Sequence, residues 1–175
     1  MCGIWATLAA PVGDAPLGLM AHRGPDGHAH VAEQVRGQSV ELGHLRLAII
    51  DLDRRADQPM NSVDGRHSIV FNGEIYNYVE LRAELQALGR TFATQSDSEV
   101  LLQAWCQWGE DCLSRLVGMF AFAILDRTAG EVVVARDPFG IKPLYVAQVG
   151  VGLACSSEIP PLLSCPGVDR TGDAE

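Results

Sequence analysis

Apolar and polar positions along this chain follow two periods, and the changes of period outline the expected elements. From Met119 onward every second residue is apolar in two adjacent segments, MFAFAILD and EVVVAR. A turn near Ala129-Gly130 separates the two segments, which indicates a pair of neighbouring strands. Shorter apolar runs elsewhere also favour strands. In all, strands are predicted at 3–9, 45–52, 68–71, 119–126, 131–136, 144–148 and 152–156.

Apolar residues spaced by three or four predict two helices in the middle of the chain, over 77–89 and 96–109. Each helix ends at a glycine, and each starts with a pair of residues that resembles a capping box. The two pairs are Asn77 with Glu80, and Ser96 with Glu99. Shorter helical segments are expected just before His22 and over 111–117.

Turn signals complete the outline. Asn72-Gly73 is a strong turn dipeptide, so we expect the chain to reverse directly after the strand at 68–71. The segments 22–27 and 137–143 are rich in glycine, proline and aspartate and are expected to be loops. Strands, then helices, then strands again predict an α/β domain in which sheets are covered by helices.

Length and charge narrow the class of protein. The chain has 175 residues, which fits one domain, and 47% of them are hydrophobic. Its formal net charge of −9 repels phosphate backbones and anionic lipids, so nucleic acid and membrane surfaces are not expected as partners. No apolar run approaches the roughly 20 residues of a membrane span, and no signal peptide is visible. A cytoplasmic location is therefore expected.

The five cysteines are irregularly spaced and include no CxxC pair, so they do not outline a disulfide framework. Cys2 stands apart because removal of the initiator methionine would leave it with a thiol and a free α-amine. The thiol has a pKa near ~8.5 and the amine near ~7.7–8.0. The amine could therefore accept the thiol proton near neutral pH, and Cys2 is a candidate nucleophile with its own base.

Attack on a carboxamide needs donors for the developing oxyanion, and Asn72-Gly73 offers a side-chain amide and a backbone N–H. An amino-acid substrate would also need a cation for its carboxylate and an anion for its ammonium group. Arg46, Glu74 and Asp97 are candidates, and all three lie near predicted element ends.

Each candidate also has a purely structural interpretation. Asn72-Gly73 could be only a turn, Asp97 only a favourable acid in the first turn of a helix, and Arg46 the partner of a surface aspartate. His22, His28 and His30 have no carboxylate or cysteine nearby that completes a metal site, so no metal is expected. Spacing alone leaves the function open.

Several blocks in order along the chain resemble the glutaminase domain of asparagine synthetases, a class II glutamine amidotransferase. They are Met1-Cys2-Gly3-Ile4, HRGPDG at 22–27, GHLRLAIIDL at 43–52, Gln58-Pro59-Met60, FNGEIYNYVELRAEL at 71–85, SDSEV at 96–100, LVGMFAFAILD at 116–126 and RDPFGIKPLY at 136–145. The resemblance covers 2–163, so residues 1–163 are assigned to this domain and 164–175 to a flexible tail.

The resemblance implies a four-layer αββα sandwich of two mainly antiparallel sheets, of the N-terminal nucleophile type. It also implies roles for individual residues. Cys2 matches the nucleophile, and Asn72 with Gly73 match the oxyanion hole. Arg46 matches the residue that holds the glutamine carboxylate, Glu74 with Asp97 match the acids around the ammonium group, and backbone near Ile49 and Ile50 matches the pocket lining. No cofactor is implied.

The expected activity is hydrolysis of glutamine to glutamate and ammonia through a Cys2 thioester. The sequence contains no pyrophosphate loop and no synthetase domain, so a separate asparagine-synthetase-like chain, or a homodimer, is the expected partner. Two alternatives remain: an amidohydrolase for another γ-glutamyl amide, and a non-catalytic interaction module of a synthetase. Pro160-Pro161 occupies a stretch that is helical in relatives, so no helix is expected there.

Overall fold

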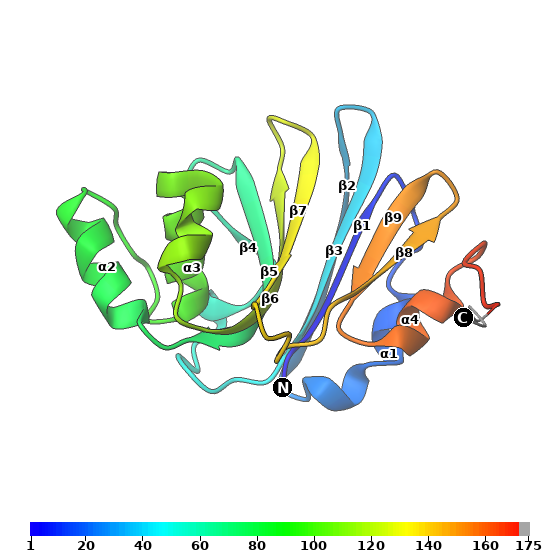
Figure 1. Ribbon diagram of the computed structural model, residues 1–175, viewed down its shortest axis with the longest axis horizontal. Helices are drawn as coiled ribbons and strands as arrows, with labels where there is room; N and C mark the ends of the chain where they lie inside the picture. Colours follow the sequence, from blue (N-terminus) through cyan, green and yellow to red (C-terminus); the bar gives the residue numbers. More distant parts are fainter. Residues whose placement is uncertain (172–175) are drawn as a thin grey trace.

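The computed structural model describes residues 1–171 and has four layers, with two antiparallel sheets packed face to face between helices (Figure 1). The first sheet has the strand order β2 (Gly27–Val35), β3 (Gln38–Arg46), β1 (Gly3–Leu8), β9 (Gly152–Ser156) and β8 (Tyr145–Val149). The second has the order β4 (Met60–Asn61), β5 (His67–Ile75), β6 (Gly118–Asp126) and β7 (Glu131–Arg136). The expected αββα sandwich of antiparallel sheets is confirmed.

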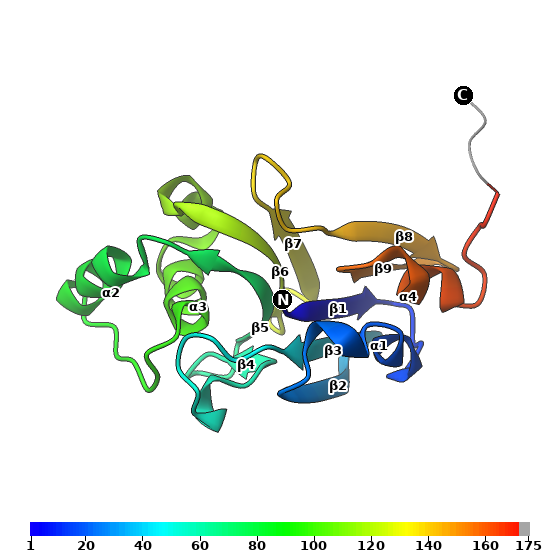
Figure 2. The ribbon, with the colours of Figure 1, turned by 90° about the horizontal axis from the view of Figure 1, so that it is seen from below.

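Helices cover the outer face of each sheet (Figures 1 and 2). The longer pair, α2 (Tyr78–Ala87) and α3 (Asp97–Trp108), lies on the second sheet, and the shorter pair, α1 (Ala15–Gly18) and α4 (Ile159–Ser164), lies on the first. Three 3₁₀ segments connect elements: η1 (Ala21–Arg23), η2 (Arg54–Ala56) and η3 (Gly109–Arg115).

The alternation of β6 explains why the sheets stack. Phe120, Phe122 and Ile124 point toward α2 and α3, whereas the alternate residues face the first sheet. Those alternate residues are Ala121, Ala123 and Leu125, two of them small, so the facing sheets can approach closely. Three apolar layers result: helix against sheet, sheet against sheet, and sheet against helix.

The hairpin of β2 and β3 was not predicted, and the strand expected at 45–52 was wrong. Strand β3 ends at Arg46, and residues 47–52 form a loop. The turn at Arg36-Gly37 has positive φ at both residues (50° and 82°), as a tight two-residue hairpin requires. Pairing of β3 with β1 and β2 buries its apolar face, and this long-range pairing does not show in the local pattern.

The reversal predicted at Asn72-Gly73 was also wrong, because both residues lie inside β5, where they pair with Ala121 and Phe120 of β6. Glycine is required at position 73 for a different reason. A Cβ there would overlap the Met119 carbonyl oxygen and lie 2.8 Å from Phe120 Cα. The glycine therefore permits close strand packing rather than a turn.

Helix ends differ in part from expectation. The Ser96 capping box is confirmed on one side, since Ser96 Oγ accepts from Glu99 N (3.2 Å). Asn77 does not cap α2; its side chain bridges Arg115 O (2.9 Å) and Val117 N (3.0 Å). A helix does form at 159–164, because both prolines occupy its first turn, where no backbone N–H is needed.

Two further features concern the chain as a whole. Cys165, in the segment expected to be a flexible tail, is buried against α4 and the first sheet, while residues 172–175 of that segment lie outside the described residues. Within residues 1–171, no helix is long and apolar enough to cross a membrane.

Candidate active site

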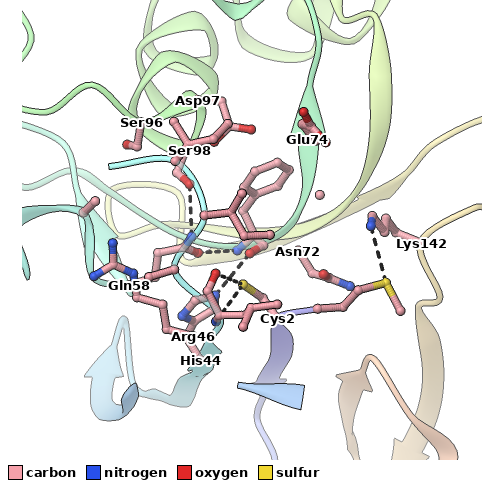
Figure 3. Close-up of a pocket in the computed structure, with 18 of the residues that line it drawn as sticks. Cys2, His44, Arg46, Gln58, Asn72, Glu74, Ser96, Asp97, Ser98 and Lys142 are labelled. Carbon is pink, nitrogen blue, oxygen red and sulfur yellow. Dashed lines mark hydrogen bonds between the residues drawn. The ribbon is translucent and has the colours of Figure 1, made fainter. Parts of the chain in front are cut away.

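One cavity of about 480 Å³ lies where the ends of both sheets meet α3, and every candidate residue from the sequence lines it (Figure 3). Those residues are Cys2, Arg46, Ile49, Ile50, Asn72, Gly73, Glu74 and Asp97. They come from five segments: the start of β1, the end of β3, the loop after β3, strand β5 and the first turn of α3. The fold therefore gathers into one cavity residues that are up to 95 positions apart in sequence.

Cys2 lies directly before β1, next to the residue that follows β3. Its Sγ is 3.6 Å from Leu47 O and 3.4 Å from Leu47 N, so both backbone groups of Leu47 hold the sulfur in place. Burial raises the pKa of the Cys2 thiol, and the Leu47 backbone and the nearby positive charges of the N-terminus and Arg46 oppose this rise. The Cys2 carbonyl oxygen accepts from Arg23 Nε (2.9 Å), which fixes the backbone of the nucleophile candidate.

Asn72 is 1% exposed, and its Nδ2 has no hydrogen-bond partner within residues 1–171. A buried amide without a partner is costly, about 1–3 kcal/mol, and is rare in folded proteins. Because Asn72 lines the cavity, this donor is available to a ligand there.

The backbone N–H of Gly73 is the second donor. Neighbouring residues of an antiparallel strand turn their N–H groups to opposite sides. Phe71 N and Ile75 N, at two residues on either side, donate to side chains on the cavity side, Gln58 Oε1 (2.5 Å) and Asp97 Oδ2 (3.1 Å). Gly73 therefore turns its N–H to the same side, away from β6, between two groups that already have partners.

Arg46 has a fixed guanidinium group. Nη1 donates to Asp57 Oδ1 (2.5 Å) and Asp53 O (3.1 Å), and Nη2 donates to Asp51 O (2.5 Å). A guanidinium group has five N–H donors, so three bonds within the described residues leave two for a ligand. Asp51 and Asp53 contribute their backbone carbonyls to Arg46, and Asp57 supplies the carboxylate.

Asp97 is buried in the first turn of α3, with Oδ2 accepting from Ile75 N. Burial raises the pKa of the Asp97 carboxyl, and its backbone hydrogen bonds, led by that from Ile75, oppose the rise. Glu74 follows Gly73 along β5, lines the same cavity and is exposed. Ile49 and Ile50 lie in the loop after β3, and the Ile49 side chain is 76% exposed.

Sequence reasoning assigned no role to two buried residues that shape the cavity. Gln58 links three segments, since Nε2 donates to Ser98 Oγ (3.1 Å) and Oε1 accepts from Phe71 N. His44 Nε2 lies 3.2 Å from Phe71 O, and burial lowers the pKa of His44 to about 4, so the ring is neutral at pH 7. Both lie in blocks that carry the family resemblance, Gln58-Pro59-Met60 and GHLRLAIIDL at 43–52, and this was the signal in the sequence that could have found them.

Two of the three histidines considered for a metal lie beside single acids instead. His22 Nε2 contacts Glu158 Oε1 (2.9 Å) and His30 Nε2 lies 3.5 Å from Glu41 Oε2. Within residues 1–171 no three histidine, cysteine or acidic side chains are grouped as metal ligands.

Comparisons with known proteins agree on one family. A family model described as a glutamine amidotransferase domain matches residues 1–175. The putative asparagine synthetase [glutamine-hydrolyzing] of Mycobacterium bovis is 45% identical over 178 residues, which cover 90% of this chain and 27% of the relative. Asparagine synthetase [glutamine-hydrolyzing] 1 of Bacillus subtilis is 44% identical over 140 residues, 80% of this chain and 21% of the relative. The chain thus spans about a quarter of the length of these curated relatives.

Among solved structures, the glutamine phosphoribosylpyrophosphate amidotransferase of B. subtilis superposes with a TM-score of 0.74 at 27% identity, covering 92% of this chain and 43% of that one. The family model spans the whole chain, the curated relatives agree with it, and the four-layer architecture matches an amidotransferase of the N-terminal nucleophile type. This chain therefore belongs to the family of glutamine amidotransferase domains.

Proposed function

We propose that this chain hydrolyses glutamine to glutamate and ammonia, with Cys2 as the nucleophile. The observation that carries the proposal is the meeting, in one cavity, of the Cys2 thiol with two donors for which residues 1–171 supply no acceptor, Asn72 Nδ2 and Gly73 N–H. A tetrahedral intermediate at a carboxamide carbon needs such a pair beside the nucleophile.

Arg46 and the two acids supply the remaining contacts for glutamine. The two free donors of Arg46 suit a carboxylate, which binds guanidinium in a bidentate manner. Asp97 and Glu74 suit the α-ammonium group, since both are acids on the cavity wall. These contacts orient the substrate and do not change during the reaction, so they set affinity more than rate.

The proposed reaction begins after Met1 is removed. The Cys2 α-amine accepts the thiol proton, and Sγ attacks the side-chain amide carbon of glutamine while Asn72 and Gly73 hold the oxyanion. The C–N bond then breaks, and the departing nitrogen takes the proton from the α-ammonium group. Ammonia is released, and the γ-glutamyl group remains on Cys2 as a thioester. Water gives one proton to the α-amine and attacks the thioester carbon. Glutamate leaves as that proton returns to the sulfur.

The partner and the acceptor of ammonia belong to the same proposal. Relatives of this chain carry the matching segment in about a quarter of a longer asparagine synthetase. We therefore propose an asparagine-synthetase-like partner, either a separate chain or more of the same polypeptide, with a homodimer as the alternative. A cytoplasmic location stays a prediction from composition.

Glutamate release from glutamine by the purified chain, measured alone and with an asparagine-synthetase-like chain added, tests the proposal. Cys2→Ala should abolish release and retain glutamine binding, whereas Cys106→Ala, at a half-buried cysteine outside the cavity, should not alter release. Faster release from another γ-glutamyl amide than from glutamine would favour the alternative amidohydrolase. No release by the Met1-free protein under either condition would refute the proposal and favour the interaction module.

A further inference from the structure

Lys142 is the one lysine in the sequence. The other twelve of the 13 basic residues are arginines. This lysine is also one of the most buried charged residues, with 6% of its surface exposed, and it lines the cavity that contains Cys2. All basic positions outside residue 142 are therefore arginine, and the single lysine lies at the cavity. Lysine carries a compact point charge, and arginine would place a planar fork with five donors there.

Asp137 fixes the backbone that carries Lys142. Its Oδ2 accepts from Lys142 N (3.0 Å) and Phe120 N (3.3 Å), and its Oδ1 accepts from Phe139 N (3.1 Å) and Ile141 N (2.9 Å). Phe120 is also the cross-strand partner of Gly73. The loop 137–142 is therefore anchored to the strand pair that presents the oxyanion donors, and Lys142 has a defined position relative to them.

The ammonium group of Lys142 has only a weak partner. Within residues 1–171 its single hydrogen bond is to Met1 Sδ (3.5 Å), and it forms no ion pair (Figure 3). A thioether sulfur is a weak acceptor, and a buried ammonium group without a carboxylate is costly. Asp137, the nearest acid in the loop, uses both oxygens on backbone N–H groups.

Removal of Met1, which the proposed function requires, takes away this partner as well. Met1 links the two groups, because its backbone joins Cys2 and its Sδ contacts Lys142 Nζ, while 57% of the Met1 surface is exposed. The new α-amine of Cys2 and the buried ammonium group of Lys142 then belong to the same cavity. Repulsion between them disfavours a second proton, and the effect is stronger in a buried site than in water.

We propose that Lys142 is a positioning residue for the nucleophile, one that acts by charge: its ammonium group keeps the α-amine of the processed Cys2 unprotonated, and thus able to accept the thiol proton at neutral pH. The same positive charge favours the thiolate over the thiol. This inference rests on the proposed function for its catalytic meaning, but the charge effect on Cys2 can be measured without turnover.

Other charged groups around Cys2 also act on its thiol and α-amine. Arg46 and Asp97 line the cavity from β3 and α3, Glu74 lines it from β5, and Arg23 contacts the Cys2 carbonyl oxygen from η1. His44, the remaining titratable group on the wall, is neutral at pH 7. Arg46 and Arg23 are each paired with an acid, Asp57 and Glu158, whereas Lys142 has no acid partner in the described part of the chain.

The pH dependence of Cys2 alkylation tests the inference. Wild type, Lys142→Met and Lys142→Arg are first shown by intact mass to lack Met1. The rate of iodoacetamide labelling at Cys2 is then followed by peptide mass spectrometry from pH 5.5 to 9.5, a range that brackets the ordinary pKa values of both groups, about 7.7–8.5. We expect the midpoint for Lys142→Met to lie on the order of 0.5–1 pH unit above wild type, and Lys142→Arg to keep the wild-type midpoint.

Two controls separate the explanations. Arg170→Gln removes one positive charge at an exposed position far along the chain and should leave the midpoint in place. Lys142→Gln provides a second neutral side chain if Lys142→Met does not fold. An unchanged midpoint in a folded neutral variant would overturn the inference. If the midpoint moves but neither wild type nor any variant releases glutamate, the proposed function is refuted, whereas the effect of the Lys142 charge on Cys2 is supported.

Discussion

Asn72→Ala should separate activity from stability, because Nδ2 has no partner within residues 1–171 and is proposed to gain one only during the reaction. The amide is buried within β5, and its Nδ2 bonds to nothing else in residues 1–171. Loss of one oxyanion donor costs roughly 2.7–4 kcal/mol in the barrier, which corresponds to a loss in kcat of about 10²–10³. KM for glutamine should stay nearly constant, since the donor acts on the transition state.

Stability should change little, for two opposing reasons. Truncation removes a buried N–H group that costs about 1–3 kcal/mol when unsatisfied, and it leaves a small cavity that costs a similar amount. In a chain of this size 1 kcal/mol shifts Tm by about 2–4 °C. We therefore expect Tm of Asn72→Ala within about 3 °C of wild type, measured by calorimetry or circular dichroism.

Gln58→Ala is the matched comparison. It removes another buried amide, one whose nitrogen and oxygen both have partners, Ser98 Oγ and Phe71 N. Phe71 N would then be left without an acceptor, so this variant should lose several kcal/mol and melt on the order of 5–10 °C lower. Asn72→Ala would refute the reasoning if it melted as low as Gln58→Ala, or if its kcat fell less than about tenfold, because the amide would then be structural.

Three further outcomes are expected. A leucine inserted between Met1 and Cys2 should leave the α-amine of Cys2 blocked, so intact mass should show retained Met1 and the glutaminase assay no turnover; an active blocked protein would exclude the amine as base. Asp97→Asn should raise KM for glutamine by about 10- to 100-fold, since it loses a charged contact, yet its Tm at pH 7 should equal or exceed that of wild type. Burial raises the pKa of Asp97 in the folded protein, so wild type loses stability as the pH rises above the unfolded pKa of about 3.9. The uncharged amide side chain of the variant does not titrate and avoids this loss. A Tm much lower than that of wild type would mean that Asp97 mainly stabilises the start of α3. For Asp137, burial raises the pKa but four backbone N–H groups outweigh it and lower the pKa overall, so its carboxylate stabilises the fold above about pH 3.9. Asp137→Asn should therefore melt lower at pH 7, and this difference should vanish as the pH falls below that value; a gap that persists in acid would contradict it.

Local patterns predicted well those elements whose stability is visible within a few residues. The alternation from Met119 to Arg136 indicated the β6–β7 hairpin, and Ser96 with Glu99 marked the start of α3, where Ser96 Oγ does accept from Glu99 N. A capping hydrogen bond and an alternating strand face depend on neighbours in sequence, so the sequence shows them directly.

Interactions between distant segments caused the errors. Asn72-Gly73 is a turn dipeptide by local preference, but pairing with β6 along its whole length keeps β5 extended through both residues. The apolar residues of 45–52 suggested one strand, yet pairing ends at Arg46 and the next residues turn away to line the cavity. The local sequence predicted that the Asn77 side chain caps α2, but this side chain bonds instead to the segment before β6.

The sequence by itself determined the family and the residue types available for chemistry, because motifs such as FNGEIYN and RDPFGIKPLY keep their order and spacing whatever the chain does in space. Only the tertiary structure decided how these groups are used. It alone shows that Gly73 turns its N–H away from β6 and that, among residues 1–171, Asn72 Nδ2 has no partner and the lysine buried beside Met1 has no acid. The physical reason is that unmet hydrogen bonds and unpaired charges are properties of the surroundings, which segments far apart in sequence create when the two sheets pack together.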